Sequence, residues 1–321
     1  MTIKVRTTSQ PLHKISVIVP TYNRADLVRL TIDSVLSQLY RNFELVVVDD
    51  GSTDHTKEVV GEYLDLPNFT YLYQENSGRS VARNHGLAIA KGEYVMFLDS
   101  DDILAEDAIQ NLAIAADQNP GSGVVAGARR FIDESDNVIE VEEPMSFRGS
   151  FSNRQIYSEK IRELFVCMGS FIVRKDIAQS LGGFNSSFEP AEDFDFFCRY
   201  CDITPVTLIE EPVVFIRHHG GNTSMQKLHE ASVKISRSNI EKINSGELQY
   251  ETGRRNQIRS MWQMRLADDL YNLNERRAAR ESYAKSLKGY PWILMSRHGP
   301  HILKQIVATL ALGDSGRKPD V

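Results

Sequence analysis

The 321-residue sequence is poor in cysteine and tryptophan, with three of the first and two of the second. An odd cysteine count does not predict a disulfide framework, and Cys198-x-x-Cys201 lacks the second Cys or His pair of a zinc site. No run approaches the roughly 20 consecutive apolar residues of a membrane-spanning helix, and the first ten residues lack the apolar core of a signal peptide. We therefore expect a cytoplasmic protein with buried thiols.

Charge is spread unevenly along the chain. Residues 226–321 hold 17 of the 37 Lys and Arg but only 10 of the 43 Asp and Glu, a net charge of +7 against −13 for the rest. The acidic body argues against nucleic acid as a partner. The basic tail suits peripheral contact with the inner face of a membrane or an acidic partner, and it is equally typical of a solvated helix face.

Short apolar runs alternate with amphipathic stretches in the first 118 residues, which predicts strand–helix–strand units and an α/β fold with a mostly parallel sheet. The helices should begin near Asp26, Asp54 and Ser80. The predicted strands are Ile15–Val19, Phe43–Val48, Thr70–Tyr73 and Tyr94–Leu98. In such sheets ligands bind beyond the carboxyl ends of the strands, so the residues following each strand are candidates for function.

The second half is harder to interpret. We expect an irregular span over Asp133–Ser152 and, from residue 226 onward, helices that end in an amphipathic segment over His301–Leu312. The other predicted elements are strands over Gly123–Ala128 and Ser170–Val173 and helices over Glu159–Val166, Lys175–Leu181 and Asp193–Cys201. These patterns predict a domain over residues 1–225 and a helical extension over 226–321, whose last apolar stripe docks on the body or lies in a membrane interface.

Three carboxylates, Asp99, Asp101 and Asp102, end the apolar run Tyr94–Leu98. Carboxylates this close repel one another unless a cation or a helix amino terminus neutralises them. Asp99-Ser100-Asp101 is therefore a candidate for binding Mg²⁺ or Mn²⁺ together with a substrate diphosphate. The alternative is that Asp101 or Asp102 caps a helix starting near Leu104.

Further polar residues follow the first two predicted strands. In Pro20-Thr21-Tyr22-Asn23, Tyr22 could stack on a flat base, or it could close the turn by a hydrophobic contact. Asp50 could accept a hydrogen bond from a base N–H, although a turn and helix cap would explain the same stretch.

Arg79 and Arg83 stand four residues apart near a predicted helix start, where guanidinium groups and the helix amino end both favour phosphate. Simple neutralisation of nearby acids is the alternative for these arginines.

Together these blocks resemble the family 2 glycosyltransferases, which have the GT-A fold. The resemblance is dense over the first hundred residues and looser to about residue 224. It rests on Ser16-Val-Ile-Val-Pro-Thr-Tyr-Asn-Arg24, Val47-Val-Asp-Asp-Gly-Ser-Thr-Asp54, Asn76-Ser-Gly-Arg-Ser-Val-Ala-Arg-Asn84 and Gly92-Glu-Tyr-Val-Met-Phe-Leu-Asp-Ser-Asp-Asp102. It implies a nucleotide-sugar donor, most simply a UDP-sugar, bound by Pro20, Thr21, Tyr22, Asn23, Asp50, Arg79, Arg83, Asp99 and Ser100, with a metal on Asp99 and Asp101.

The second half adds two matches to the same family. Glu192-Asp193 resembles its Glu-Asp motif, which implies Asp193 as the catalytic base of an inverting transfer. Arg217-His218-His219 resembles its closing Arg-x-His loop, which implies that His219 contacts the metal or diphosphate. Gly169 and Ser170 fall where such enzymes bind the acceptor, and we also expect Glu192 and Arg217 to belong to the acceptor site or its loop. Helix capping by Glu192 and Asp193, and a histidine pair without a role, are the alternatives.

We therefore predict a metal-dependent inverting glycosyltransferase that acts on a saccharide, lipid-linked or protein acceptor in surface polysaccharide or glycoconjugate synthesis. Two other classes stay open. A nucleotidyltransferase shares the need for nucleotide and metal, but the stretch after the first strand is not a Gly-rich phosphate loop. A catalytically silent carbohydrate- or nucleotide-binding module would need no base.

Overall fold

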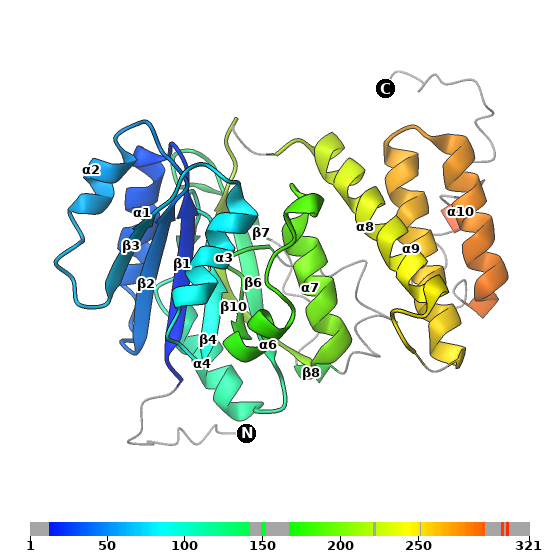
Figure 1. Ribbon diagram of the computed structural model, residues 1–321, viewed down its shortest axis with the longest axis horizontal. Coiled ribbons are helices and arrows are strands. Elements are labelled where there is room, and N and C mark those ends of the chain that lie inside the picture. The colour runs from blue at the N-terminus through cyan, green and yellow to red at the C-terminus, as the bar shows by residue number, and fades with distance from the viewer. Residues whose placement is uncertain are drawn as a thin grey trace. The chain divides into compact units, whose positions relative to one another are not determined.

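The computed structural model describes residues 13–141, 149–151, 167–220, 223–250, 252–292, 303–304 and 306–307 (Figure 1). These residues form two compact units. The first takes the described residues up to 151, then 167–186 and 196–220; the second takes 187–195 and the described residues from 223 onward. Within the described residues, no helix is both long enough and apolar enough to cross a membrane.

Four parallel strands form one half of the sheet in the first unit. They are arranged in the order β3 (Phe69–Tyr73), β2 (Phe43–Asp49), β1 (Ile15–Thr21) and β4 (Tyr94–Phe97). Every residue of β1 and β2 is buried, as expected for strands covered on both faces. The connecting helices are α1 (Ala25–Leu36), α2 (Thr56–Gly61) and α3 (Arg79–Ile89). The predicted strands and helix starts are confirmed here to within two residues.

The other half of the sheet mixes directions, in the order β4-β9-β6-β10-β5. β9 (Phe171–Arg174) runs antiparallel between β4 and β6 (Val124–Ile132), and β10 (Val206–Arg217) runs parallel to β6. The short strands β5 (Ile103–Leu104), β7 (Val138–Val141) and β8 (Gly149–Phe151) pair antiparallel with β10, β6 and β10 respectively. The remaining elements are α4 (Ala108–Gln118), α6 (Lys175–Ser180), the short 3₁₀ helix η2 (Ser186–Phe188) and α7 (Glu192–Ile203). The predicted α/β class is confirmed.

Three local predictions differ from the structure. The helix expected from near Leu104 begins only at Ala108, because Ile103 and Leu104 pair with Phe215 and Val214 of β10. The span from Asp133 to Ser152, expected to be irregular, contains β7 and β8. The long strand β10 was not predicted at all. The helix expected over Glu159–Val166 lies outside the described residues.

The core of the first unit has two parts. Apolar side chains of β1, β2 and β4 pack against α1 and α4, and each such buried side chain contributes roughly 1.5–3 kcal/mol. A separate aromatic cluster joins β4 to α7. In it the Phe184 ring is stacked on Phe196 at 4.0 Å and meets Phe97 edge-on at 4.7 Å. This cluster lies beside the carboxyl end of β4.

The described part of the second unit contains three long helices, α8 (Met225–Ser245), α9 (Thr252–Asn272) and α10 (Arg276–Gly289), shown in yellow to orange in Figure 1. α9 packs against both of its neighbours. Gly246 ends α8 with φ = 83°, a left-handed conformation that glycine adopts without steric cost. In the predicted final segment the four described residues are helical, and Leu303 and Val307 are more than half exposed. Whether that segment docks or meets a membrane stays a prediction.

Candidate functional site

Three carboxylates gather just beyond the end of β4. One oxygen from each of Asp99, Asp101 and Asp102 lies within 4.8 Å of the others. The Asp99 and Asp101 side chains are 37% and 20% exposed, whereas Asp102 is buried. Burial, followed by the charges of Asp101 and Asp99, raises the pKa of Asp102 well above its usual value. The three side chains therefore lie close together at the edge of the sheet, as predicted. We call them the Asp99 cluster.

Capping does not explain the Asp99 cluster. The residue before α4 is Asp107, and its side chain makes no capping hydrogen bond. Asp102 instead accepts a hydrogen bond from the Arg217 backbone N–H at 3.0 Å on Oδ1. The alternative that Asp101 or Asp102 caps the following helix is therefore wrong, because β5 separates them from α4.

Basic side chains surround the two more exposed carboxylates. Buried Arg83 places Nη2 2.6 Å from Asp99 Oδ1. His219 Nε2 lies 2.9 Å from Asp101 Oδ2, and Arg24 Nη2 lies 3.8 Å from the same oxygen. His219 therefore lies beside the carboxylates, and its contact with a metal or diphosphate stays a prediction. A set of carboxylate oxygens with one imidazole nitrogen fits the ligand preferences of Mn²⁺, and the oxygens alone fit those of Mg²⁺.

Arg217 is a buried residue that connects the Asp99 cluster to neighbouring segments of the chain. Its Nε donates to the Asp101 carbonyl at 3.2 Å, and its Nη1 donates to the Asp133 carbonyl at 3.1 Å. Its Nη2 also lies 2.6 Å from Asp136 Oδ1. Arg217 therefore joins the end of β10 to the carboxylate turn and to the turn before β7. These contacts give it a positioning role, and its predicted role in the acceptor loop stays a prediction.

Sequence reasoning missed what holds Arg83 in place. The side chain of Asn84 donates to the Phe184 carbonyl at 2.9 Å and accepts from the Phe184 N–H at 2.8 Å, so it clamps that residue on both sides. The Arg83 guanidinium lies 5.2 Å from the centre of the Phe184 ring. Arg79, in contrast, is exposed at the first position of α3. The predicted arginine pair thus divides into one buried and one exposed member.

The loop after β1 is fastened to the loop after β2. Asn23, with φ = 51°, accepts from the Thr53 N–H at 2.7 Å, and its own N–H donates to Ser52 Oγ at 2.9 Å. Pro20 and Thr21 are buried within β1, whereas Tyr22 is 46% exposed. An exposed ring on a fixed loop is available to stack on a ligand, and the stacking itself stays a prediction.

Asp50 holds the segment that leads into α3. Its Oδ1 accepts from Gln74 Nε2 at 2.6 Å and from the Ser77 N–H at 2.8 Å, and its Oδ2 accepts from the Gly78 N–H at 2.9 Å. A carboxylate offers about four acceptor positions, so one stays for a base N–H. The predicted contact with a base remains a prediction, beside a structural role that accounts for most of the Asp50 hydrogen bonds.

Gly169 and Ser170 have structural explanations of their own. Gly169 has φ = 79°, and a Cβ there would lie 2.8 Å from side-chain carbons of both Leu98 and Val214. Ser170 is buried and donates from Oγ to the Cys167 carbonyl at 2.8 Å. Ser100 is likewise buried. The predicted acceptor roles of Gly169 and Ser170 stay predictions.

Glu192 and Asp193 lie in the second unit, at the start of α7. Glu192 is buried. Asp193 Oδ1 accepts from the Phe194 N–H at 2.7 Å. α7 passes from the second unit to the first between Asp195 and Phe196. The first turn of α7 is thus grouped with the helices that follow residue 222.

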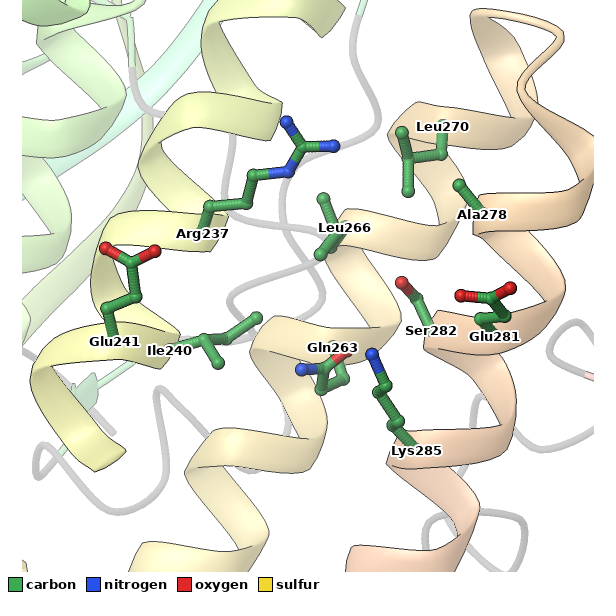
Figure 2. Close-up of a pocket in the computed structure, with 10 residues that line it drawn as sticks. All are labelled: Arg237, Ile240, Glu241, Gln263, Leu266, Leu270, Ala278, Glu281, Ser282 and Lys285. Atoms are coloured by element: carbon green, nitrogen blue, oxygen red, sulfur yellow. The ribbon is translucent and has the colours of Figure 1, made fainter. Parts of the chain in front are cut away.

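A cavity of about 270 Å³ lies between the three helices of the second unit (Figure 2). Its floor is formed by α9 residues Gln263, Leu266 and Leu270, with Ile240 of α8 beside them. Ile240, Leu266 and Leu270 are already buried, so an occupant would cover little additional apolar surface. The rest of the lining includes Arg237, Glu241, Glu281 and Lys285, but among the described residues the Asp99 cluster is the group that brings three possible metal ligands together.

The fold and the Asp99 cluster together define a GT-A type protein, and solved structures share this fold. Staphylococcus aureus TarS 1–349, solved in complex with UDP-GlcNAc, aligns with a TM-score of 0.66 and 20% identity over 92% of this chain and 89% of that one. A mannosyltransferase of Pyrobaculum calidifontis, solved with GDP-Man and Mn²⁺, aligns with a TM-score of 0.55 and 20% identity over 95% and 88%.

The family model for glycosyl transferase family 2 matches residues 16–182. The chain belongs to this family and is an enzyme of the glycosyltransferase class, so the resemblance is confirmed.

Curated relatives agree with the family. Glycosyltransferase GlyA of Streptococcus pneumoniae serotype 4 is 46% identical over 100 residues, which are 31% of this chain and 14% of that protein. Chondroitin synthase of Escherichia coli is 29% identical over 67% of this chain and 30% of that protein. An uncharacterized glycosyltransferase of Rickettsia typhi is 28% identical over 67% of this chain and 68% of its own length. The chain thus spans less than a third of two of these relatives.

Proposed function

We propose that this protein transfers a sugar from a nucleotide-diphosphate donor, a UDP-sugar in the simplest case, to a hydroxyl acceptor with inversion at the anomeric carbon. The observation that carries the proposal is the Asp99 cluster, in which three carboxylates converge at the sheet edge beside Arg83, Arg24 and His219. Such a set matches a divalent cation and a diphosphate bound together. The donors and Mn²⁺ bound by the two structural neighbours support the same chemistry.

In this proposal Asp99 and Asp101 hold Mg²⁺ or Mn²⁺, with His219 as a further ligand. Held by these residues, a divalent metal would supply positive charge against the negative charge that develops on the departing diphosphate. Arg83 holds Asp99 in place and adds positive charge near the diphosphate, and Tyr22 stacks on the base. Asp50 keeps the loop before α3 in position and accepts a hydrogen bond from the base.

The displacement needs a base for the acceptor hydroxyl, and we assign Asp193 to that role. The acceptor oxygen forms a bond to the anomeric carbon as the bond from that carbon to the diphosphate oxygen breaks. The bonding electron pair leaves with the diphosphate, and the acceptor proton passes to the Asp193 carboxylate. Its place in the first turn of a helix is consistent with an ionised carboxylate, because the helix dipole stabilises negative charge there.

The proposal also covers the acceptor, for which it names only a chemical class. The similarity to chondroitin synthase and to TarS supports a saccharide or polymer acceptor in surface polysaccharide or glycoconjugate synthesis, whether free, lipid-linked or protein-bound. We place the protein in the cytoplasm, with the basic helical region available for peripheral contact with an anionic membrane. The exposed Trp292 after α10 is a side chain suited to a membrane interface.

The test is a panel of UDP-, GDP- and dTDP-sugars, scored for Mn²⁺- or Mg²⁺-dependent donor hydrolysis and for protection against thermal unfolding. The variants are Asp101→Ala and Asp193→Asn, with Asp65→Asn as an exposed control. We expect one donor to be hydrolysed only with metal. Hydrolysis should be lost in both site variants but not in the control, and Asp193→Asn should still be protected by the donor. Metal-independent protection without hydrolysis would instead indicate a binding module.

A further inference from the structure

Helix α9 carries two neighbouring stripes of side chains, one residue apart in sequence, that face different surroundings. Gln263, Leu266 and Leu270 line the floor of the cavity in Figure 2. Trp262, Arg265 and Asp269 repeat the same spacing of three and four residues, so they form a neighbouring stripe. Trp262 and Asp269 are buried. The second stripe therefore packs against other parts of the second unit.

What it packs against is Phe194, the residue after the proposed base. The Phe194 and Trp262 rings meet edge to face with centroids 6.1 Å apart, and the Arg265 guanidinium lies 4.8 Å from the centre of the Phe194 ring. Phe194 is itself buried. An edge-to-face ring pair and a cation over a ring face are both directional contacts, so together they fix where this ring lies.

Arg265 is in turn held by a polar group that joins α9 to α8. Asp269 accepts from Arg265 Nε at 3.1 Å and from Ser232 Oγ at 2.6 Å, and His229 Nδ1 lies 2.9 Å from its other oxygen. We call Asp269, His229, Ser232 and Arg265 the Asp269 cluster. Because the carboxylate engages both oxygens, the Arg265 side chain has little freedom to move away from Phe194.

The contact reaches Asp193 through a single peptide unit. The Phe194 N–H donates to Asp193 Oδ1 at 2.7 Å, and the Asp195 N–H donates to the Ala191 carbonyl at 3.2 Å. Adjacent Cα atoms are about 3.8 Å apart, so a ring fixed at position 194 limits how far the carboxylate at 193 can move.

We propose that the C-terminal helices position the proposed catalytic base, with Trp262 and Arg265 as the positioning residues and Phe194 as the side chain they hold. This inference rests on the proposed function, because the role of Asp193 belongs to it. It assigns the helical region a part in the chemical step, beyond any part in acceptor choice or membrane contact.

A specific kinetic pattern follows from where the groups lie. The residues assigned to donor and metal, Tyr22, Asp99 and Asp101, belong to the first unit, whereas Phe194 and its contacts belong to the second. Loosening Phe194 should therefore lower kcat and leave donor binding intact. Misplacement of a reacting group by about 1 Å can cost roughly a hundredfold in rate.

The experiment uses the full chain and compares Arg265→Met and Trp262→Leu with the conservative changes Arg265→Lys and Trp262→Phe. Gln263→Met, one residue along α9 on the cavity face, is the matched control. We would measure the Kd of UDP with Mn²⁺ and the kcat of Mn²⁺-dependent UDP-GlcNAc hydrolysis. In a Trp292→Phe background, Trp262 is the only tryptophan of the chain. Its fluorescence emission should therefore change when Phe194→Leu removes the ring that Trp262 contacts.

We expect Arg265→Met and Trp262→Leu to lower kcat roughly ten- to hundredfold, with Kd changed less than about twofold. The conservative variants should recover most of the loss, and Gln263→Met should match the wild type. Adding Phe194→Leu to the double variant Arg265→Met/Trp262→Leu should cost little more, because those two changes already remove both contacts of the Phe194 ring.

Two results would overturn the inference while leaving the proposed function standing. One is an unchanged kcat in Arg265→Met and Trp262→Leu. The other is a parallel loss of kcat and donor affinity, which would indicate general destabilisation. A wild type that neither binds UDP with Mn²⁺ nor hydrolyses any donor of the panel would overturn the proposed function, and this inference with it.

Discussion

The two units each contain an aspartate beside a histidine and an arginine, yet the two groups differ in charge balance. In the Asp99 cluster one oxygen of each of three carboxylates lies within 4.8 Å of the others; Arg83 pairs with Asp99, and His219 and Arg24 approach Asp101. In the Asp269 cluster a single carboxylate receives Arg265, Ser232 and His229. The second group gives a single carboxylate three partners, whereas the first crowds three carboxylates together.

This difference separates a group that positions other residues from a group suited to bind a ligand. Removing one partner from a completed buried group costs folding free energy, because the remaining charge loses its compensation. Removing a carboxylate from a crowded group relieves repulsion, so its loss should appear in ligand binding and rate. Equivalent substitutions should therefore differ in effect. In the Asp99 cluster they should lower donor binding and rate without loss of stability, and in the Asp269 cluster they should lower stability, and through Phe194 kcat, without loss of donor affinity.

The largest expected effect is on activity, for Asp101→Asn. Loss of this proposed metal ligand should lower metal-dependent donor hydrolysis roughly a thousandfold, since a metal contributes several kcal/mol to stabilising the developing charge. Its urea unfolding midpoint should not fall. A variant with normal hydrolysis, or one with a large loss of stability, would contradict this view of the Asp99 cluster.

Asp269→Asn should show the reverse behaviour. Arg265 would lose its carboxylate, so we expect the free energy of unfolding to fall by about 3 kcal/mol in urea titrations. UDP affinity should stay unchanged. The neighbouring Asp268→Asn is the control: Asp268 accepts from the Tyr283 hydroxyl, and an amide oxygen can accept as well, so its loss should be smaller.

Phe184→Leu tests whether packing holds the positive charge of the Asp99 cluster. The variant loses the stacking on Phe196 and the ring face below Arg83, which together contribute roughly 2 kcal/mol to the free energy of unfolding. UDP binding with Mn²⁺ should also weaken, because Arg83 no longer holds Asp99. Phe69→Leu, another buried ring of the first unit, should lose stability without weakening UDP binding.

The smallest effect concerns Glu44, another buried carboxylate that is compensated like Asp269. Burial would raise the pKa of Glu44, but hydrogen bonds from Ser16 Oγ and the Lys91 N–H, with the charge of Lys14, outweigh it and lower the pKa. A lowered folded pKa means that the stabilisation is present above the unfolded value of about 4.3 and is lost as pH falls through the folded value.

The stability advantage of the wild type over Glu44→Gln should therefore shrink as the pH of urea titrations is lowered from 6 to 3. An advantage that stays constant or grows on acidification would show that the ionised carboxylate is not the stabilising form.

The parallel half of the fold could be predicted because its signals are local. Each of β1 to β4 is an apolar run bounded by polar turns, and α1 to α3 show helical spacing. β10 escaped prediction because Glu210-Glu211-Pro212 interrupts it and is typical of a turn. In the structure the strand continues through these residues, and its pairing with β6 shifts register on both sides of Pro212. β5 escaped because its two residues are ordered by a strand more than a hundred positions away.

The same distinction holds for the candidate site. The meeting of Asp99, Asp101 and Asp102 followed from neighbouring positions in sequence, and the approach of His219 was implied by the resemblance. The Asn84 clamp on Phe184 and the contacts of Phe194 with α9 join residues 68 to 100 positions apart, so no local pattern indicates them. The role assigned to Asp193 is tested by the experiments above, whereas those assigned to Tyr22, Asp50, Gly169 and Ser170 stay predictions.

Because α7 has residues in both units, shortening the chain during protein production would affect the proposed active site. A shortened chain that stops at residue 225 would retain Phe194 but lose Trp262 and Arg265, leaving an aromatic ring bare next to Asp193. We expect such a fragment to aggregate more readily than the full chain and to have a lower kcat. Screening for acceptors should therefore begin with all 321 residues.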